Sequence, residues 1–455
     1  MERYIIWFRR LLPSPFSIAL VLTIVSLIGV LGFNVSQTGT FQFTQTIRWW
    51  SNGLWTPSLM VFAMQMMLML VLGHVLALSS GIRRLINVVV QFCIDSSRAA
   101  WVICTLTIIV GLFNWGLGLI FGAILAKRVA YHFTLENKPF NYPLLAAAGY
   151  SALMVWHGGL SGSALIKAAE PNAIHEMMKG IMEPQNLASL PVQIPITSTV
   201  FSARNLTVSL MVLLVLPLVL AYIGKKIPGK QVDTETGTHS NTKSSEPAIG
   251  AEHIDRSPMA GILVGGGIIA YCIYLLVRGG GSFFTPNNIN LTLLGLCLFS
   301  HQKINSFLSA IEYAIRDASG ILIQFPLYFG IMGLINESGL ITAIAESFTA
   351  ISNEFTYPLF TYISAGIVNI FVPSGGGQWV VQGPIILLSA YELNVPIEKA
   401  ILALAYGDQI TNMLQPFWAL PLLGITRLSA RDILPYTLIM FSVGFVIYLA
   451  GLALF

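Results

Sequence analysis

Long apolar segments constrain this chain more than any other feature of its sequence. A helix needs about 20 mostly apolar residues to cross a bilayer. Only 10% of the 455 residues are charged, whereas soluble domains carry about 25%. The sequence therefore predicts an all-α polytopic membrane protein. The candidate spans are 15–33, 58–79, 142–168, 206–223, 258–277, 287–300, 318–336, 397–424 and 434–454.

Two further apolar segments, 99–130 and 357–391, are too long for one clean span. Glycine and polar residues interrupt both of them, as FNWGLG at 113–118 and VPSGGG at 372–377. Each glycine costs about 1 kcal/mol relative to alanine in a helix interior. We therefore expect each segment to form a re-entrant helical hairpin with the interruption at its tip.

The positive charges predict how the chain crosses the membrane. If both hairpins return to their own side and the N-terminus is cytoplasmic, 18 of the 24 Lys and Arg residues lie on the inner side. This bias satisfies the positive-inside rule. The first apolar run has no small-residue cleavage site after it, so we interpret it as the first transmembrane helix. The polar segment 225–257 has the composition of a flexible linker on the cytoplasmic side.

The two halves of the chain resemble each other in the order of their elements. Residues 1–224 and 287–455 each contain a span, a hairpin, a broken span and a final span, with a connecting helix and loop at 258–286. The extra span makes the number of crossings between them odd, so the second repeat is predicted to be inverted. The repeat aligns Asn114 with Asn369. Inverted repeats with discontinuous helices are typical of secondary transporters.

Four breaks in the helices are the candidate binding positions. They are the two hairpin tips, WHGGLSGS at 156–163 in the first broken span, and GDQITNMLQP at 407–416 in the second. Irregular backbone at membrane depth survives only when it is buried in protein or lines a wet cavity. Free carbonyls there suit a cation, and free amides at half-helix N-termini suit an anion. Nearby oxygen-bearing side chains are Asn114, Ser161, Ser163, Asn369, Ser374, Asp408, Thr411 and Asn412.

Asp408 is the one clear acid within the core of a predicted span. An intramembrane acid is costly and is a functional candidate by default, although it could also brace the helix bundle. His157 has the same two interpretations, as a substrate or proton contact or as a structural histidine. Tryptophans flank all four breaks and could form an aromatic wall for a small ligand, or simply pack. They are Trp115, Trp156, Trp379 and Trp418.

Four stretches together resemble the bacterial short-chain fatty acid transporter family, which includes acetoacetate and butyrate uptake proteins. They are NWGLGLIFGA (114–123), GGLSGS (158–163), VPSGGGQWVVQGP (372–384) and MLQPFWALP (413–421). The resemblance implies uptake of small monocarboxylates across the inner membrane. A more distant similarity to the ion transporter superfamily implies a homodimer with a scaffold domain and an elevator-type transport domain. The Ser-Asn-Thr signature of the sodium symporters in that superfamily is missing from both hairpin tips, so sodium coupling is not implied.

The leading hypothesis is a secondary transporter that imports a short-chain fatty acid with Na⁺ or a proton. It requires no resident cofactor and no nucleic acid. The expected cation-coupling residues are Asn114, Asn369, Asp408, Thr411 and Asn412, with Asn114 and Asn369 as ligands if the cation is Na⁺. The expected substrate-binding residues are Trp115, His157, Ser161, Ser163, Ser374, Gly375, Gly376, Gly377, Gln378, Trp379 and Trp418.

Two alternatives belong to other functional classes. Residues 159–162 match the G-x-S-G motif of rhomboid-type intramembrane proteases, but four residues match by chance often, and the repeat has no role in a protease. A passive anion channel is the other alternative. The sequence leaves open the preferred acid, the coupling ion and its stoichiometry, the oligomeric state, and whether Asp408 carries a proton or is structural.

Overall fold

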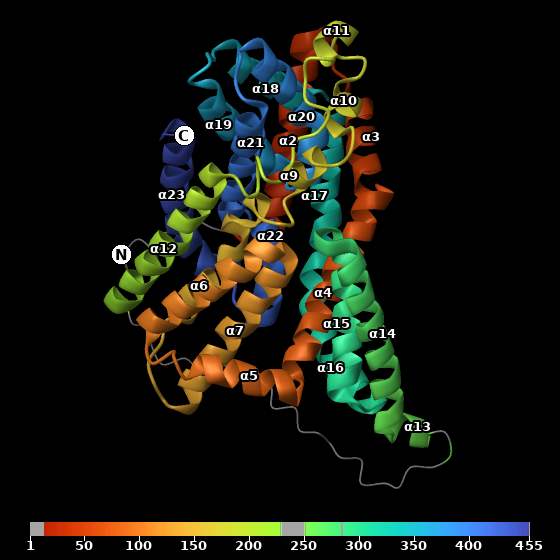
Figure 1. Cartoon of the computed structure of the whole chain (residues 1–455), viewed down its shortest axis with the longest axis vertical. Coiled ribbons are helices and arrows are strands. Elements are labelled where there is room, and N and C mark those ends of the chain that lie inside the picture. The colour runs from red at the N-terminus through yellow and green to blue at the C-terminus, as the bar shows by residue number, and fades with distance from the viewer. Residues whose placement is uncertain (1–12, 228, 230–249, 251, 284, 455) are drawn as a thin grey trace.

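A computed structural model describes residues 13–227, 229, 250, 252–283 and 285–454 of the chain (Figure 1). Their regular secondary structure is helical, and their one β-bridge joins Lys179 to Met182. Seven helices of the described chain are long and apolar enough to cross a membrane. The prediction of an all-α polytopic membrane protein is confirmed. The basic N-terminus and most of the predicted linker, including residues 230–249, lie outside the described residues.

Long helices occupy the predicted spans. Four of them begin at a proline in the first turn, where a missing amide costs nothing, and in α2, α14 and α15 the preceding side chain caps the helix. Ser14, for example, accepts a hydrogen bond from the amide of Ser17 at 3.2 Å. These helices are α2 (Pro15–Thr38), α4 (Pro57–Leu78), α12 (Ala203–Lys226), α14 (Pro258–Gly279), α15 (Pro286–His301), α17 (Ser319–Glu337) and α23 (Ala430–Leu454). All except α15, which has 16 residues, belong to the seven apolar helices above.

Four short helices between these spans were not predicted. They are α3 (Phe43–Leu54), α5 (Ser80–Val90), α16 (Ile304–Ala314) and α18 (Leu340–Ala350). Each follows a long helix, and in both halves the order is long, short, long, short, hairpin, broken helix, long. The order of elements therefore agrees with the predicted repeat, while the inversion of the second half stays a prediction.

Both interrupted segments form helical hairpins. Hairpin 1 consists of α6 (Ser96–Phe113) and α7 (Trp115–Leu135), and hairpin 2 consists of α19 (Tyr357–Phe371) and α20 (Gly375–Glu392). Hairpin 1 lies in the lower half of the molecule and hairpin 2 in the upper half (Figure 1). The hairpins therefore approach the middle of the molecule from opposite ends.

Two further helices are broken near the middle of the molecule. The first is α8 (Tyr142–Ala148), followed by two 3₁₀ turns and α9 (Ser163–Ala168). The second is α21 (Ile397–Thr411), a 3₁₀ turn at Asn412–Leu414, and α22 (Pro416–Thr426). We call residues 149–162 break 1 and residues 412–415 break 2. A direct bond links them, because the Tyr150 hydroxyl donates to the Asn412 carbonyl at 2.9 Å.

The helices pack in two groups. The hairpins, the broken helices, α12 and α23 pack with one another, whereas α2, α3, α4 and α14 to α17 form the second group. Small residues allow close approach within each group. A Cβ added at Gly333 of α17 would lie 2.5 Å from the Cα of Gly53 in α3, for example. The four segments predicted to bind ligands therefore share one body, built from both halves of the chain.

Candidate functional site

Glycines let break 1 lie directly against hairpin 1. A Cβ added at Gly159 would overlap the backbone carbonyl of Leu112 at the end of α6, and one at Gly162 would overlap the carbonyl of His157. No residue with a side chain fits at such distances without movement. The GGLSGS stretch is therefore explained by close packing of backbone on backbone.

Break 1 also closes the tip of hairpin 1. Asn114 caps α7, with its Oδ1 accepting the Leu117 amide at 2.9 Å. The first amide of α7, that of Trp115, donates to Ser161 Oγ at 3.0 Å. The Leu160 amide donates to the Leu112 carbonyl at 2.8 Å. The first of the N-terminal amides of α7 is therefore already paired at this tip.

The tip of hairpin 2 is open in comparison. Ser374 caps α20, with its Oγ accepting the Gly377 amide at 3.2 Å. The amides of Gly375 and Gly376, the first two of α20, have no acceptor in the described part of the chain. Free amides at a helix N-terminus bind anions. Hairpin 2 thus leaves two adjacent N-terminal amides open in the described chain, where hairpin 1 leaves one, that of Gly116.

Asn369 fastens hairpin 2 to break 2. Asn369 lies inside α19, whereas Asn114 lies at the turn of hairpin 1. The two residues align in the sequence repeat but occupy different positions in their hairpins. Asn369 Nδ2 lies 2.6 Å from the Asp408 carbonyl, 2.9 Å from Thr411 Oγ1 and 2.9 Å from Asn412 Oδ1. Asp408, Thr411 and Asn412 therefore surround Asn369, and all four are predicted cation-coupling residues.

Two amide oxygens near this contact remain unpaired. Gln415 Nε2 donates to the Asn369 carbonyl at 2.6 Å. The side-chain oxygens of Asn369 and Gln415 are buried, and neither has a hydrogen-bond donor among the described residues. Amide oxygens are hard ligands of the kind that small cations prefer.

A buried acid and a histidine connect break 1 to α21, the helix that precedes break 2. His157 Nδ1 lies 3.4 Å from Asp408 Oδ1, and the two side chains are 0% and 1% exposed. The Ala164 amide donates to His157 Nε2 at 2.9 Å. An acceptor nitrogen carries no hydrogen, so the neutral ring carries its hydrogen on Nδ1, facing the acid.

The Asp408 carboxylate is poorly compensated. Both of its oxygens are buried, and neither has a hydrogen bond within the described chain. A buried carboxylate in this state is unfavourable unless a cation or a proton neutralises it. Asp408 is thus a position where a cation can bind.

The open tip of hairpin 2 lies directly on this pair. A Cβ added at Gly375 would lie 2.8 Å from His157 Cε1, 2.8 Å from Trp156 Cη2 and 3.1 Å from Asp408 Oδ2. Ser163 lies on the other side of the tip, 3.9 Å from a Cβ added at Gly376. Free amides, an acid and a histidine thus meet where hairpin 2 contacts both broken helices.

Three of the four predicted tryptophans form one aromatic cluster beside the pair. The Trp156 ring stacks on His157 with centroids 4.5 Å apart. Trp115 lies 6.0 Å from Trp156 and 5.0 Å from Trp418, and Phe62 of α4 lies 6.0 Å from Trp418. The indole nitrogens of Trp156 and Trp418 are buried and lack an acceptor in the described chain. The cluster is an apolar wall with two spare donors.

Two predicted residues lie apart from the acid and histidine. Gln378 is buried inside hairpin 2, where its Nε2 donates to the Ala365 carbonyl at 2.8 Å and to Gln382 Oε1 at 2.7 Å. Trp379 is buried in α20, and no ring contact joins it to the aromatic cluster among the described residues. Both residues are engaged in hairpin 2 itself.

The sequence did not single out two residues that position the site. Gln409 Oε1 accepts the amides of His157 at 3.0 Å and Gly158 at 3.3 Å. Asn205 of α12 donates to the Gly158 carbonyl at 2.8 Å and accepts the Tyr406 hydroxyl at 3.0 Å. Gln409 stands next to Asp408 in the GDQITN stretch, which was a usable signal. Asn205 is an isolated polar residue, and no neighbouring motif marks it in the sequence.

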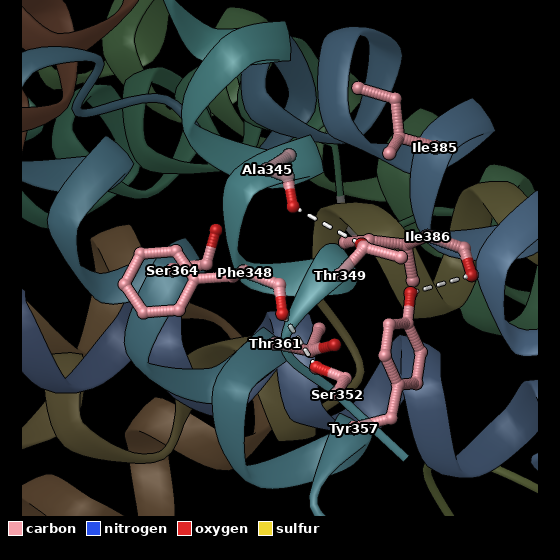
Figure 2. Close-up of a pocket in the computed structure, with 9 residues that line it drawn as sticks. All are labelled: Ala345, Phe348, Thr349, Ser352, Tyr357, Thr361, Ser364, Ile385 and Ile386. Carbon is pink, nitrogen blue, oxygen red and sulfur yellow. Dashed lines mark hydrogen bonds between the residues drawn. The ribbon is translucent and has the colours of Figure 1, made fainter. Parts of the chain in front are cut away.

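A small cavity between α18, α19 and α20 is not a second ligand site (Figure 2). Its volume of about 10 Å³ holds roughly one water molecule. The hydroxyls of Thr349, Ser352 and Tyr357 in its wall donate to the backbone carbonyls of Ala345, Phe348 and Ile386, respectively. The cavity is therefore a packing defect whose polar groups are satisfied.

Comparison with known sequences identifies the family. The model of the short chain fatty acid transporter family matches residues 1–455. A protein of Haemophilus influenzae is 34% identical over 94% of this chain and 93% of its own length. A protein of Escherichia coli K12 is 32% identical over 98% of this chain and 97% of its own length. Both relatives carry the provisional name short-chain fatty acid transporter.

Two solved structures resemble the fold at low scores. One is Neisseria gonorrhoeae MtrF, described as one of a class of antimetabolite efflux pumps, with a TM-score of 0.43, 13% identity and coverage of 100% and 97% of the two chains. The other is the Alcanivorax borkumensis YdaH transporter, with a TM-score of 0.42, 14% identity and coverage of 97% of each chain. No conclusion about this chain rests on scores at this level.

The family match also decides between the functional classes. Ser161 of the G-x-S-G motif accepts the Trp115 amide, and both relatives are named as transporters rather than proteases. The chain is therefore a transporter and not an enzyme. It is a multi-pass membrane protein that belongs to the short chain fatty acid transporter family.

Proposed function

We propose that this protein imports a short-chain monocarboxylate, such as butyrate or acetoacetate, together with one cation across the bacterial inner membrane. One observation supports this proposal above the others. The Asp408 carboxylate is buried without a hydrogen bond in the described part of the chain, and it lies beside Gly375 at the tip of hairpin 2. An anion-binding tip and an uncompensated acid therefore share one site.

The carboxylate of the substrate would bind at the tip of hairpin 2. The amides of Gly375 and Gly376 would donate to it, and the Trp156 ring would contact the ligand beside Gly375. The short acyl chain would pack on Trp115 and Trp418. Such a site combines an apolar wall with a few polar groups that fix the ligand's orientation, as small-molecule sites generally do.

Coupling to a cation follows from the charges. A substrate carboxylate at Gly375 would lie close to the Asp408 carboxylate, and two like charges in a buried site are strongly unfavourable. A proton or Na⁺ at Asp408 removes this repulsion. Substrate and cation would therefore bind together more tightly than either binds alone, which is the condition for symport.

Na⁺ would have oxygen ligands at this position. The Asp408 carboxylate and the unpaired side-chain oxygen of Asn369 are the first candidates, with Thr411 and Asn412 beside them. Asn114 is a weaker candidate, because its side-chain oxygen already caps α7. As implied by the family resemblance, we further propose a homodimer whose hairpins and broken helices move together as an elevator-type body.

Uptake of radiolabelled butyrate into proteoliposomes tests this function. Na⁺ and proton gradients are imposed separately, and accumulation above equilibrium is measured. We expect one of the two gradients to drive accumulation and an ionophore to abolish it. Uptake that only equilibrates under either gradient would identify a passive channel, and absence of uptake for every monocarboxylate would refute the substrate class.

A further inference from the structure

A cavity of about 480 Å³ lies at the other end of α22 from the candidate site. Its walls come from Ser319 and Gly320 of α17, Leu420 and Leu423 of α22, and the loop after α22. Two exposed arginines, Arg316 and Arg427, also line it, and no acid of the described chain is among its lining residues. The size falls within the range of small-molecule sites, roughly 300–1,000 Å³.

Helix α22 connects this cavity to the aromatic cluster. The helix has 11 residues, from Pro416 beside break 2 to Thr426, so its length is about 16 Å at 1.5 Å per residue. Trp418 in its first turn belongs to the cluster, and Arg427 follows its last turn. A Cβ added at Gly320 would lie 3.6 Å from Leu420 Cδ2. The cavity thus begins within one helical turn of Trp418.

The positive charge of this region extends beyond the two arginines. The ring of Tyr313 has the Arg427 guanidinium 5.5 Å from its centroid and Lys127 Nζ 5.9 Å from it. Arg316, Arg427 and Lys127 all lie in segments that the charge pattern predicts to be cytoplasmic. Cations gathered at the mouth of a low-dielectric cleft raise the local concentration of anions. A guanidinium also matches the planar geometry of a carboxylate.

We propose that this cavity is an inner vestibule, in which Arg316 and Arg427 hold the monocarboxylate between the cytoplasm and the central site. The carboxylate pairs with the guanidinium groups, and the acyl chain contacts Leu420 and Leu423. The proposal rests on the proposed function, because it takes the same monocarboxylate as its ligand. It adds a second, lower-affinity station that serves only the cytoplasmic side.

The test compares the two sides of the membrane. Butyrate transport is measured in right-side-out and in everted membrane vesicles for wild type, for the double variant Arg316→Gln/Arg427→Gln, and for Arg431→Gln, a nearby arginine that does not line the cavity. We expect the double variant to raise the half-saturating butyrate concentration about tenfold from the cytoplasmic side, as expected for a lost charge-assisted contact. The half-saturating concentration of the double variant from the outer side should equal that of wild type. For Arg431→Gln, the half-saturating concentrations from both sides should equal those of wild type.

Further variants keep the test decisive if the double variant folds poorly. Arg316→Gln alone leaves the Arg427–Tyr313 contact intact and should give part of the shift, and Arg427→Lys should restore part of it. A half-saturating concentration that is unchanged, or that rises equally from both sides, would overturn the vestibule.

Two controls separate this proposal from its alternatives. Saturable butyrate transport by wild type from both sides establishes the proposed function independently of the arginines, and its absence refutes that function rather than the vestibule alone. The variants are also reconstituted in neutral phosphatidylcholine and in anionic phosphatidylglycerol. A shift seen only with the anionic lipid would show that the cavity holds a lipid headgroup, which also overturns the proposal.

Discussion

The two hairpin tips are built alike and differ at one hydrogen bond. In each tip, the side chain of a polar residue caps the second helix by accepting a hydrogen bond from the amide three residues later. The capping residue is Asn114 in hairpin 1 and Ser374 in hairpin 2. In hairpin 1 the first amide of the helix donates to Ser161. In hairpin 2 the first two amides have no acceptor among the described residues, and the first of them belongs to Gly375, which packs beside Asp408.

This difference assigns the two tips different roles. Hairpin 1 is fastened to break 1 by its backbone, and the first amide of α7 is occupied by Ser161. Hairpin 2 leaves its helix N-terminus open and has small residues at the contact, so a ligand can approach its backbone. A symmetric repeat can in this way produce one ligand site rather than two.

Of the variants that separate the two tips, Asp408→Asn should have the largest effect on butyrate transport. The change removes the one buried carboxylate at hairpin 2, and with it the site where a cation neutralises the substrate charge. Breaking such buried charge coupling typically costs about 3–5 kcal/mol, so gradient-driven accumulation of butyrate should fall by at least about 100-fold. Exchange of butyrate at equal concentrations should continue. Asp432→Asn, at an exposed acid outside the site, is the control, and wild-type accumulation by Asp408→Asn would make Asp408 structural.

Gly375→Ala and Gly376→Ala sharpen the comparison within hairpin 2. Both add one methyl group near the start of the same helix, but only the Cβ at Gly375 would contact His157, Trp156 and Asp408, at 2.8–3.1 Å. Overpacking of this kind costs about 1–3 kcal/mol, so the butyrate dissociation constant should rise about 10- to 100-fold for Gly375→Ala. Gly376→Ala, with its nearest neighbour 3.9 Å away, should change it by less than about threefold. Equal effects in a binding titration would place the ligand elsewhere.

Ser161→Ala should affect stability more than binding. It removes the acceptor of the Trp115 amide in hairpin 1, and a buried amide without a partner costs about 1–3 kcal/mol. The midpoint of thermal unfolding in detergent should therefore fall, while the butyrate dissociation constant changes less than it does for Gly375→Ala. Ser163→Ala is the matched control for stability only, because the Ser163 hydroxyl makes no hydrogen bond in the described chain but lies beside the tip of hairpin 2. A large loss of affinity with unchanged stability would show that hairpin 1 also binds the ligand.

Hydrophobic length and glycine positions carried most of the fold prediction. The long apolar runs predicted the spans, because the bilayer sets the length of a helix directly. The short helices α3, α5, α16 and α18 were missed, because 11 or 12 residues do not form a spanning signal. Their amphipathic faces are stabilised by packing against neighbouring helices, which the sequence does not display.

The candidate site was predicted by residue type but not by arrangement. Asp408 and His157 were recognisable because ionisable groups are expensive in a membrane. Their pairing across the two breaks was not recognisable, since the residues are far apart in the sequence. Hydropathy and motifs likewise could not reveal that Ser161 closes one tip while the other stays open, because that depends on where a single hydroxyl points.

The central claim is that substrate and cation meet at Asp408 beneath the open tip of hairpin 2. Titration of butyrate into the purified protein at a series of pH values and Na⁺ concentrations tests it directly. For wild type, linkage to one bound cation predicts that butyrate affinity rises up to about tenfold for each tenfold increase in either proton or Na⁺ concentration. For Asp408→Asn the dependence should disappear. A wild-type affinity that responds to neither cation would contradict the account.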